Sequence, residues 1–495
     1  MQYIVTGDEM REYDKNTIER IGMGAMVLME RAAMAVASVI VQYTAPCKVL
    51  IVCAIGNNGA DGLALARLLM DLKYAVSICI IGDKARATKQ FQEQFRILTH
   101  YEPHWIEHSA DVVNGSFDII VDALFGVGLS REITGEYAVL LEQINTMDGY
   151  KVAVDIPSGI CADTGKVLGC AFRADVTVTF AFAKKGMYYF PGSDYVGQLI
   201  IADIGINEKA FGDRKPSLFT YNEAPHMLLP QRRADGNKGT FGKVLVIAGF
   251  EHMIGAAILS ARAALEMGAG MVKVLCPEEN RVILQSAIAE VLYGTCDELE
   301  ESLAWADVVI VGPGLGKSAT AVGMLEQVLA RAKHPLVLDA DALNRISELP
   351  KLQQALKAYE REVVLTPHMG ELARLAHTKV TEVKEHTIDI AKHLAKEYHV
   401  IMVCKDAQTL VASPNQNMLY LNASGNDGMA TAGSGDVLAG IIGALLAQRE
   451  PAFEACCKGV CLHGHAGTQA AQKYTRYGVT ASRIIDNIKD LYRDW

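Results

Sequence analysis

The chain alternates short aliphatic runs with longer segments of helical periodicity. Nine of the short runs are continuously apolar, which is typical of parallel strands covered on both faces. They occupy residues 48–56, 117–126, 150–159, 174–182, 242–249, 306–314, 334–342, 362–368 and 399–406. Helical spacing of apolar residues marks segments such as 60–73 and 254–270. The pattern predicts an α/β fold with parallel sheets.

A stretch without periodicity between two groups of predicted strands suggests how the chain is divided. Residues 207–238 hold three prolines, many charges and little periodicity. We therefore expect a boundary near residue 220, between domains of residues 1–220 and 221–495. In open α/β sheets, ligands bind beyond the carboxyl ends of the strands. Many of the predicted strands end in Asp, Gly, Ser or His, so each domain should carry one such crevice.

Composition narrows the class of protein. Half of the 495 residues are apolar, and the net charge of -10 argues against a nucleic-acid partner. The first residues mix acids and bases without an apolar core, so no signal peptide is expected. The longest apolar run found, residues 437–447, is too short to span a bilayer. These features predict a cytoplasmic protein without a membrane partner.

The 11 cysteines are an odd number, and none stands in a Cys-x-x-Cys pair. Most lie in apolar runs, as expected of small buried residues in a reducing compartment. One cluster allows two interpretations. Cys457, Cys461 and His465 would share one helix face, which makes a metal site conceivable. The spacing is not that of a zinc finger or ribbon, so an apolar helix face is the simpler interpretation.

The first crevice begins at residues 56–62, with the sequence GNNGADG between a strand and a helix. The glycines allow a tight turn, the asparagine amides offer donors and acceptors, and Asp61 could cap the helix. The loop lacks the Gly-x-Gly-x-x-Gly spacing of a dinucleotide fingerprint. A plain capped turn therefore remains an alternative to a ligand site.

Two further strand ends favour a ligand site. Asp122 ends one strand before a glycine turn, and Asp155 and Ser158 end another. Asn58, Asp122 and Ser158 offer neutral and anionic oxygens, which suit a hard cation. Asp155 could then transfer a proton. Each acid could instead serve as a cap or turn former.

These motifs, together with VLMERAA and TVTFAFAKKG, resemble the NAD(P)H-hydrate epimerases over residues 5–210. The resemblance implies a Rossmann-like domain that interconverts the R and S forms of hydrated NADH and NADPH. It also implies a potassium ion near Asn58, Asp122 and Ser158. Arg31 departs from the asparagine common in this family and is expected to alter a local contact. The implied substrate contacts are Asn57, Asn58, Gly59, Ala60, Asp61, Gly126, Val127, Gly128, Leu129, Ser130, Arg131, Glu132 and Asp155.

The second crevice contains a false match to a nucleotide-binding loop. Residues 316–318 read Gly-Lys-Ser, but Val311 stands where the phosphate-binding loop needs a glycine, and Pro313 removes a backbone donor. A P-loop is therefore rejected. Charged or ionisable residues that could take part in binding or catalysis follow other predicted strands. They are Asp339, His368 with Glu371, and Lys405.

Residues 431–440, TAGSGDVLAG, form the last candidate site. Gly433, Ser434 and Gly435 precede a helix whose first amides and dipole would favour an anion. Asp436 either caps that helix or takes part in chemistry.

The second half resembles the ribokinase-like fold, and within it the nucleotide-dependent NAD(P)H-hydrate dehydratases, over residues 225–490. The matching motifs include LVLDADALN, LTPHMGEL and NDGMATAGSGDVLAGIIGALLAQ. The resemblance implies that Asp436 is the base that accepts the hydroxyl proton, and that magnesium accompanies ADP or ATP. Implied hydrate contacts are Ala257, Gly314, Gly316, His368 and Asp436. Implied nucleotide contacts are Lys405, Asp406, Ala407, Gln408, Thr409, Gly433, Ser434 and Gly435.

Together the two halves resemble a bifunctional repair enzyme for hydrated NADH and NADPH. A Rossmann-like three-layer domain would precede a ribokinase-like domain, and members of such families are often homo-oligomers. Where the family often has Lys-Gly-Ala-Gly-Thr, Asp406 and Gln408 leave less room for a nucleotide. A ribokinase-like vitamin kinase is the alternative, but it leaves the first half without a role. A scaffold without activity is a third possibility, which the intact Asp122, Asp155 and Ser158 argue against.

Overall fold

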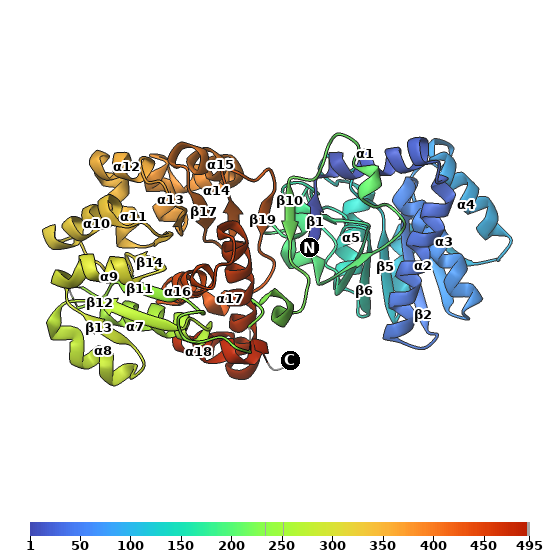
Figure 1. Cartoon of the computed structure of the whole chain (residues 1–495). Coiled ribbons are helices and arrows are strands. Elements are labelled where there is room, and N and C mark those ends of the chain that lie inside the picture. The colour runs from blue at the N-terminus through green and yellow to red at the C-terminus, as the bar shows by residue number, and fades with distance from the viewer. Residues whose placement is uncertain (233, 251, 493–495) are drawn as a thin grey trace. The chain divides into compact units, whose positions relative to one another are not determined.

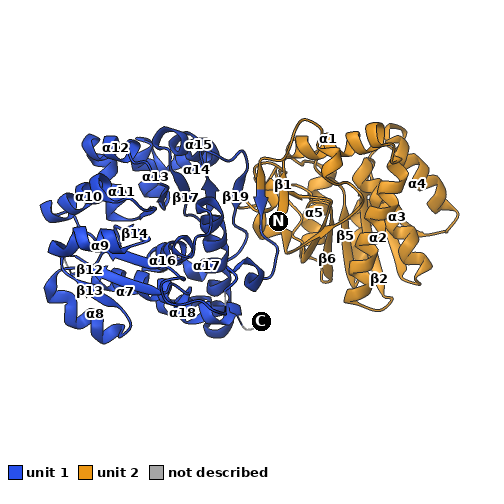
Figure 2. Ribbon diagram, viewed as in Figure 1, with its two compact units in different colours: residues 1, 219–495 blue, residues 2–218 orange. Residues whose placement is uncertain are grey.

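A computed structural model describes residues 1–232, 234–250 and 252–492 of the chain. It divides into two compact units, residues 2–218 and residues 1 and 219–495 (Figures 1 and 2). The division lies beside the position near residue 220 at which the sequence suggests a boundary. All nine predicted strands are present.

The first unit, residues 2–218, is built on a parallel sheet of seven strands in the order β4-β3-β2-β5-β6-β7-β9. The order reverses between β2 and β5, which creates the switch point where doubly wound sheets bind ligands. Strand β1 pairs in parallel with β8. The strands are β1 (Gln2–Val5), β2 (Lys48–Ala54), β3 (Ala75–Ile81), β4 (His104–Ile106), β5 (Ile119–Ala123), β6 (Tyr150–Val154), β7 (Val176–Phe180), β8 (Ala183–Lys184) and β9 (Gln198–Ala202).

Helices cover both faces of this sheet. Buried residues of α2 and α3 pack with Val49, Ile51 and Cys53 of β2, whereas those of α5 pack with Leu50 and Val52. This two-sided burial explains why the strands are apolar throughout rather than at alternate positions. The helices are α1 (Gly7–Asn16), α2 (Ala25–Tyr43), α3 (Asn57–Asp71), α4 (Lys89–Thr99), α5 (Glu136–Thr146) and α6 (Ser193–Val196).

Helix α2 corrects one expectation from the sequence. Among the described residues, it is long and apolar enough to cross a membrane by length and composition, whereas no run of that length was expected. Glu30 and Arg31 interrupt its apolar residues, which is why the run seemed shorter. Its inner face, including Ala33 and Ile40, is buried in the core of the first unit. Core helices of soluble proteins pass the same test, so the finding is weak evidence for a membrane span.

The second unit contains a sheet in the order β13-β12-β11-β14-β15-β16-β17-β18-β19-β10. Strands β11 to β17 are parallel, and β18 and β19 pair antiparallel to their neighbours. The order reverses between β11 and β14. The strands are β10 (Leu218–Thr220), β11 (Lys243–Ile247), β12 (Met271–Leu275), β13 (Leu292–Gly294), β14 (Val308–Val311), β15 (Leu336–Leu338), β16 (Val363–Leu365), β17 (Ile401–Cys404), β18 (Leu410–Ala412) and β19 (Leu419–Leu421).

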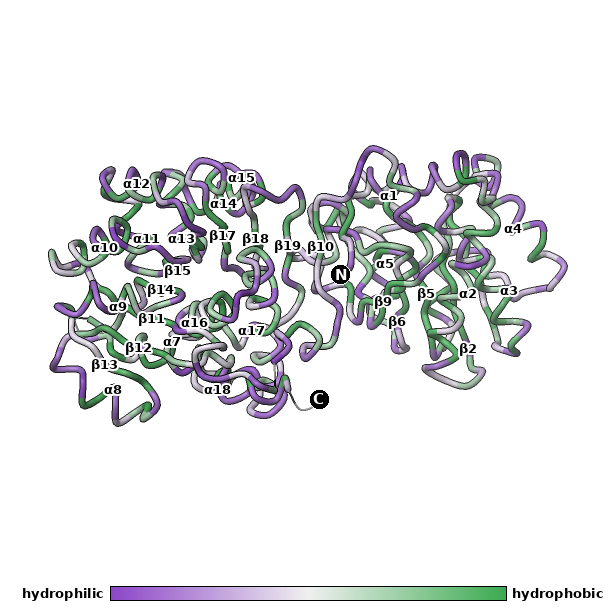
Figure 3. Tube along the Cα trace, in the orientation of Figure 1, coloured by the Kyte–Doolittle hydropathy of each residue, from purple (hydrophilic) through white to green (hydrophobic). Residues whose placement is uncertain are grey.

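Helix α16 lies at the centre of the second unit, packed against α7 and α17. Gly440 lets it approach α7, since a Cβ there would lie 2.2 Å from the Ser260 carbonyl oxygen. Figure 3 shows the apolar positions gathered in the inner strands and helices, with hydrophilic loops outside. The helices are α7 (Ile254–Glu266), α8 (Arg281–Ala287), α9 (Leu299–Trp305), α10 (Ala319–Arg331), α11 (Asp341–Glu348), α12 (Pro350–Lys357), α13 (Met369–Leu375), α14 (Val380–Glu385), α15 (Thr387–Tyr398), α16 (Ser434–Ala447), α17 (Ala452–Tyr474) and α18 (Ala481–Ile488).

Candidate active sites

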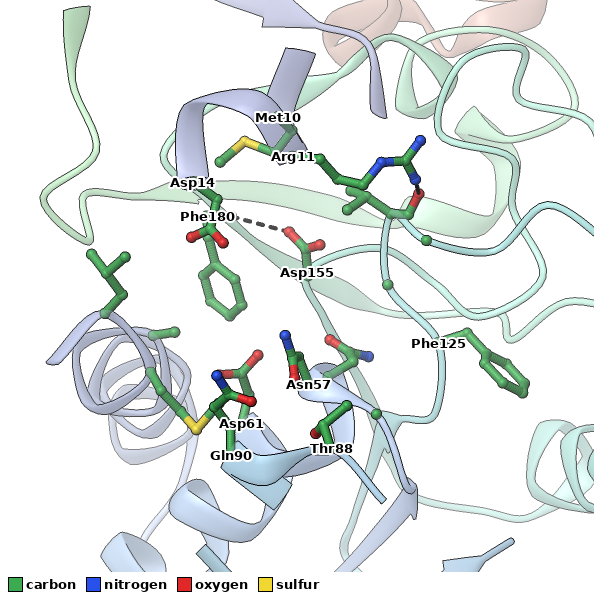
Figure 4. Close-up of a pocket in the computed structure, with 18 of the residues that line it drawn as sticks. Met10, Arg11, Asp14, Asn57, Asp61, Thr88, Gln90, Phe125, Asp155 and Phe180 are labelled. Atoms are coloured by element: carbon green, nitrogen blue, oxygen red, sulfur yellow. Dashed lines mark hydrogen bonds between the residues drawn. The ribbon is translucent and has the colours of Figure 1, made fainter. Parts of the chain in front are cut away.

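A cavity of about 740 Å³ opens at the carboxyl ends of β2, β5 and β6 in the first unit (Figure 4). Most of the residues predicted for this crevice line it: Asn57, Asn58, Asp61, Gly126, Val127, Gly128, Leu129, Ser130, Arg131 and Asp155. Gly59, Ala60 and Glu132 are not among the lining residues. The sequence did not predict the contributions of α1 and of two later strands: Met10, Arg11, Asp14, Phe180 and Lys184.

The GNNGADG turn is tighter than expected. Helix α3 begins at Asn57, with Gly56 as its cap residue and no capping side chain, so Asp61 lies inside the helix and does not cap it. A Cβ at Gly59 would lie 1.7 Å from the Ala54 carbonyl oxygen, and only glycine permits this approach to β2. The early start brings Asn57, Asn58 and Asp61 to the cavity from one helix end.

Asp155 is held by a buried lysine. Lys184 Nζ donates to Asp155 Oδ1 at 2.5 Å, to Thr179 Oγ1 at 2.7 Å and to the Phe180 carbonyl oxygen at 3.3 Å. These three bonds use all three ammonium protons. Asp155 also has a φ of +67°, a strained value for a residue with a side chain. The surroundings therefore fix this carboxylate in one orientation, with Oδ1 committed to Lys184.

The other oxygen of Asp155 faces the cavity. A Cβ at Gly126 would lie 3.3 Å from Asp155 Oδ2 and 3.5 Å from Asn58 Oδ1, which places both groups against the same turn. Two more carboxyl groups reach this space from α1 and α3, and Figure 4 shows Asp14 and Asp61 beside it. Burial raises the pKa of Asp61 well above its usual range, and the charges of Asp155 and Asp14 raise it further.

Asp122 and Ser158 form a buried pair and are not among the residues that line the cavity. Ser158 donates its amide to Asp122 Oδ2 and its hydroxyl to Oδ1, both at 2.7 Å, and the Ser158 hydroxyl accepts from the Phe125 amide at 2.8 Å. Burial raises the pKa of Asp122 to about 6 despite these bonds. The buried Asn58 Nδ2 makes no hydrogen bond within the described residues. Amide, carboxylate and hydroxyl oxygens beside an under-compensated carboxylate fit a hard monovalent cation.

The second site is centred on Lys405, which follows β17 and pairs with the acid at the end of β15. Lys405 Nζ donates to Asp339 Oδ1 at 2.6 Å, and Asp339 is buried. Burial opposes the charge of Lys405, but the carboxylates of Asp339 and Glu371 outweigh it and raise the lysine pKa. Ala340, the next residue, has φ 49° and ψ -116°, a region that side-chain-bearing residues avoid. The strain marks this strand end as a constrained site.

The TAGSGD turn lies against this lysine. A Cβ at Gly435 would come within 3.1 Å of Lys405 Nζ. Helix α16 begins at Ser434, its cap residue is Gly433, and no side chain caps it, so Asp436 does not serve as the cap. Burial raises the pKa of Asp436 to about 7, and Asp339 adds to the shift. Asp436 can therefore accept a proton near neutral pH.

His368 and Glu371 stand at the end of β16. The His368 ring accepts from the Gly370 amide at 2.9 Å, and Glu371 Oε2 accepts from the His368 amide at 2.9 Å. Burial lowers the pKa of His368, and Lys405 lowers it further. Burial raises the pKa of Glu371 to about 7. The His368 ring is exposed and available to a ligand, whereas Glu371 is buried behind it.

The remaining predicted contacts differ in accessibility. Gly314 and Gly316 are buried, and Asp341 Oδ2 accepts from the Gly316 amide at 2.9 Å. Ala257 is fully buried in α7, and its methyl group lies beside Gly249. A ligand contact from Ala257 would therefore require the surrounding loops to move.

The lysine loop after β17 is mostly open. Asp406 and Ala407 are exposed, Gln408 is half-buried and Thr409 is buried. The Thr409 carbonyl oxygen accepts from the Asn422 amide at 2.9 Å, which ties the end of the loop to β19.

The cysteine cluster lies within helix α17. Cys456, Cys457 and Cys461 are buried in the core of the second unit, and His465 is half-buried. Among the described residues, no group of three His, Cys, Asp or Glu side chains is arranged to hold a metal ion. The sequence did not single out His463, which is buried and lies 3.3 Å from the Ser434 hydroxyl.

Comparisons with known proteins find a matching family for each unit. Residues 244–490 match the family described as NAD(P)H-hydrate dehydratase, and residues 25–186 match the YjeF-related protein N-terminus. The bifunctional NAD(P)H-hydrate repair enzyme of Moorella thermoacetica is 35% identical, with 99% of this chain and 97% of that protein covered. The enzyme of the same description from Escherichia coli is also 35% identical, with 97% and 92% covered.

A solved structure supports the fold of the second unit. The crystal structure of a ribokinase-like superfamily protein from Enterococcus faecalis is 30% identical, with a TM-score of 0.51. It covers 56% of this chain and 96% of that chain. The ribokinase-like fold expected from the sequence is therefore confirmed. With its whole length similar to two-domain relatives, the chain belongs to the family of bifunctional NAD(P)H-hydrate repair enzymes.

Proposed function

We propose that this chain repairs hydrated NADH and NADPH. Its first unit interconverts the R and S hydrates, and its second unit converts the S hydrate to the reduced coenzyme at the expense of ADP or ATP. The observation that carries the proposal is that one chain holds two carboxylates, Asp155 and Asp436, each beside a glycine turn at a ligand-binding edge. Similarity along the whole length to two-domain repair enzymes supports both halves.

The chemistry of the first unit follows from its two kinds of carboxyl group. The hydroxyl-bearing carbon of the hydrate adjoins the ring nitrogen, so loss and return of the hydroxyl as water inverts that carbon. Asp61, whose pKa is raised by burial and by the charges of Asp155 and Asp14, donates a proton to the hydroxyl. The carbon–oxygen bond breaks as the ring nitrogen forms a double bond to the carbon. Water then adds to the other face and gives its proton to Asp155 Oδ2.

Potassium would be held by Asn58, Asp122 and Ser158, whose oxygens are suited to it. When bound, it supplies positive charge beside the buried Asp122 carboxylate. The chain's own contribution is to fix the turn at Phe125 and Gly126, through Ser158 on one side and the close approach of Asn58 on the other. This turn lines the cavity in which the substrate would bind.

The chemistry of the second unit begins with the nucleotide, whose phosphate charges magnesium would screen. The first amides of α16 and the Lys405 ammonium favour its terminal phosphate. Asp436 accepts the proton of the hydrate hydroxyl, and that oxygen attacks the terminal phosphorus, displacing AMP from ADP or ADP from ATP. Loss of inorganic phosphate and of a proton from the neighbouring ring carbon then restores the double bond.

The same arrangement assigns roles to the residues that follow β16 and β17. We assign Lys405 to Thr409 to the nucleotide and His368 to the hydrate, because the first group flanks the turn and the exposed imidazole lies at the next strand end. The free thiols suit work in a reducing compartment such as the cytoplasm. We also propose that the chain assembles into a homo-oligomer, as its sequence resemblance implies.

A repair assay tests the proposal. A mixture of R and S hydrates of NADH is incubated with the protein and either ADP or ATP, and the near-ultraviolet absorbance of the reduced ring is followed. Recovery beyond the S fraction requires both activities. Recovery that stops at the S fraction would contradict the epimerase role. A small-molecule kinase would not restore the absorbance.

A further inference from the structure

The loop that precedes α16 is seated on helix α17 within the second unit. Ser424 Oγ donates to the Cys461 carbonyl oxygen and Asn426 Nδ2 donates to that of Gly467, both at 3.0 Å. Gly464 makes the approach possible, because a Cβ there would lie 2.1 Å from Ser424 Oγ. Helix α17 is thus a platform for the segment that ends in the proposed phosphate-binding turn.

His463 extends from this platform to the turn itself. Its side chain is buried, with 8% of its surface exposed, and its Nε2 lies 3.3 Å from Ser434 Oγ. Burial lowers the pKa of His463 to about 4, and the positive charge of Lys405 contributes. The imidazole is therefore neutral at physiological pH and acts as a hydrogen-bonding group rather than as a cation.

The partner of His463 is the first residue of α16. The amides of a first helical turn have no partner within the helix and point toward a bound anion. Gly433, with φ +86°, and Gly435 flank Ser434, so the backbone around it has little conformational preference of its own. Ser260 Oγ donates to the Asp436 carbonyl oxygen at 3.0 Å, and a side-chain bond at Ser434 is a second contact that can fix the direction of these amides.

We propose that His463 is a positioning residue for the dehydration reaction, holding Ser434 and through it the turn of residues 433–435 that binds the terminal phosphate of ADP or ATP. The inference rests on the proposed function of the second unit and adds to it a residue outside the substrate contacts. The proposal concerns the hydrogen bond between the imidazole ring and the Ser434 hydroxyl. A role in general packing would not require Ser434.

The test is a double-mutant cycle in the full chain. His463→Ala, Ser434→Ala and the double variant are compared with the wild type for the nucleotide Michaelis constant, kcat and the calorimetric dissociation constant of magnesium-bound ATP. Loss of one buried hydrogen bond should weaken nucleotide binding about 3- to 10-fold in each single variant. The double variant should be no weaker than either single one, since both remove the same bond.

Two further variants distinguish positioning from packing. His463→Gln can place an amide near the position of Nε2 and should restore most of the nucleotide affinity. His465→Ala is the matched control, because His465 lies on the same helix and makes no hydrogen bond to the turn among the described residues. It should leave nucleotide affinity unchanged. If His463→Ala fails to fold, Ser434→Ala and His463→Gln still decide the matter, because a pairing with Ser434 predicts a loss in the first and near-normal affinity in the second.

The inference is overturned if the effects of His463→Ala and Ser434→Ala multiply, or if Ser434→Ala leaves nucleotide affinity unchanged. It is also overturned if His465→Ala weakens binding as much as His463→Ala. Failure of the proposed function has a different signature: the wild type would not restore reduced coenzyme, although the calorimetric cycle would still report on the turn.

Discussion

Replacing Asp436 by Asn should separate catalysis from stability in the second unit. Asn keeps the size and hydrogen-bonding capacity of the side chain but cannot accept the hydroxyl proton. We therefore expect dehydration to fall by roughly 10²-fold or more. Nucleotide affinity should hold or improve, because a negative charge beside the phosphates is removed.

The same substitution should stabilise the protein at neutral pH. The pKa of Asp436 rises from 3.8 to about 7 on folding, because burial and Asp339 disfavour its charge. The folded state thus keeps a proton that the unfolded chain loses, so the free energy of unfolding falls as pH rises from about 4 to 7. Three pKa units at about 1.4 kcal/mol each set an upper limit of about 4 kcal/mol. Solvent at this half-buried group reduces the expected gain to roughly 2 kcal/mol.

Denaturant unfolding of both proteins at pH 5 and pH 8, with turnover and nucleotide affinity measured alongside, checks these values. The stability advantage of Asp436→Asn should be larger at pH 8 than at pH 5. The wild-type kcat should rise with pH through about 7 as the carboxylate forms. Turnover retained by the variant would refute the assigned base. A joint loss of turnover and nucleotide affinity would instead indicate that Asp436 holds the metal ion.

Four further results are expected. Asp155→Ala should lower epimerisation about 10²–10⁴-fold and leave dehydration of the pure S hydrate unchanged, as assayed separately on each hydrate. Lys184→Met should lower the unfolding free energy of the first unit by about 3–5 kcal/mol, because a buried carboxylate loses its partner; addition of Asp155→Asn should recover much of this in denaturant titrations. Exchange of potassium for tetramethylammonium should lower both epimerisation and the melting temperature of residues 2–218, whereas an unchanged melting temperature would argue against the cation site. A fragment beginning at Pro216 should fold and dehydrate the S hydrate alone, and insoluble or inactive material would contradict the separability of the units.

The start of that fragment was set by the structure. A division at residue 220 would remove β10 from the second unit. Phe219 of β10 belongs to the core of that unit, and its ring lies 5.5 Å from that of Tyr420. A fragment beginning at Tyr221 should therefore be less stable than one beginning at Pro216, which thermal unfolding of the pair would show.

The strands could be predicted because both faces of each sheet are covered, which leaves a continuous apolar signal. Edge strands β4 and β13 were missed because their residues are mostly exposed or only partly buried, which leaves no continuous apolar signal. Strand β3 was missed because its exposure varies along its length. The start of α3 was placed too late, since close packing at Gly59, rather than a capping side chain, sets it.

The site residues also divide into those that the sequence pattern could predict and those that it could not. Residues at strand ends, such as Asp155 and Lys405, carry a local signal and could be named. Asp14 and His463 reach the sites from helices whose position only tertiary packing decides. Lys184 did have a signal, because a lysine at the end of an apolar run suggests a buried, paired charge. Reading TVTFAFAKKG for its charge, as well as for resemblance, would have found it.

The most direct test of the account is repair of a pure R hydrate by the full chain, with Asp155→Ala and Asp436→Asn run in parallel. With ADP or ATP present, the wild type should convert all of the R hydrate to reduced coenzyme, and neither variant should do so alone. A mixture of the two variants should recover the activity, because each retains the site that the other lacks. A mixture that stays inactive, or an Asp155→Ala variant that repairs the R hydrate at the wild-type rate, would contradict the account.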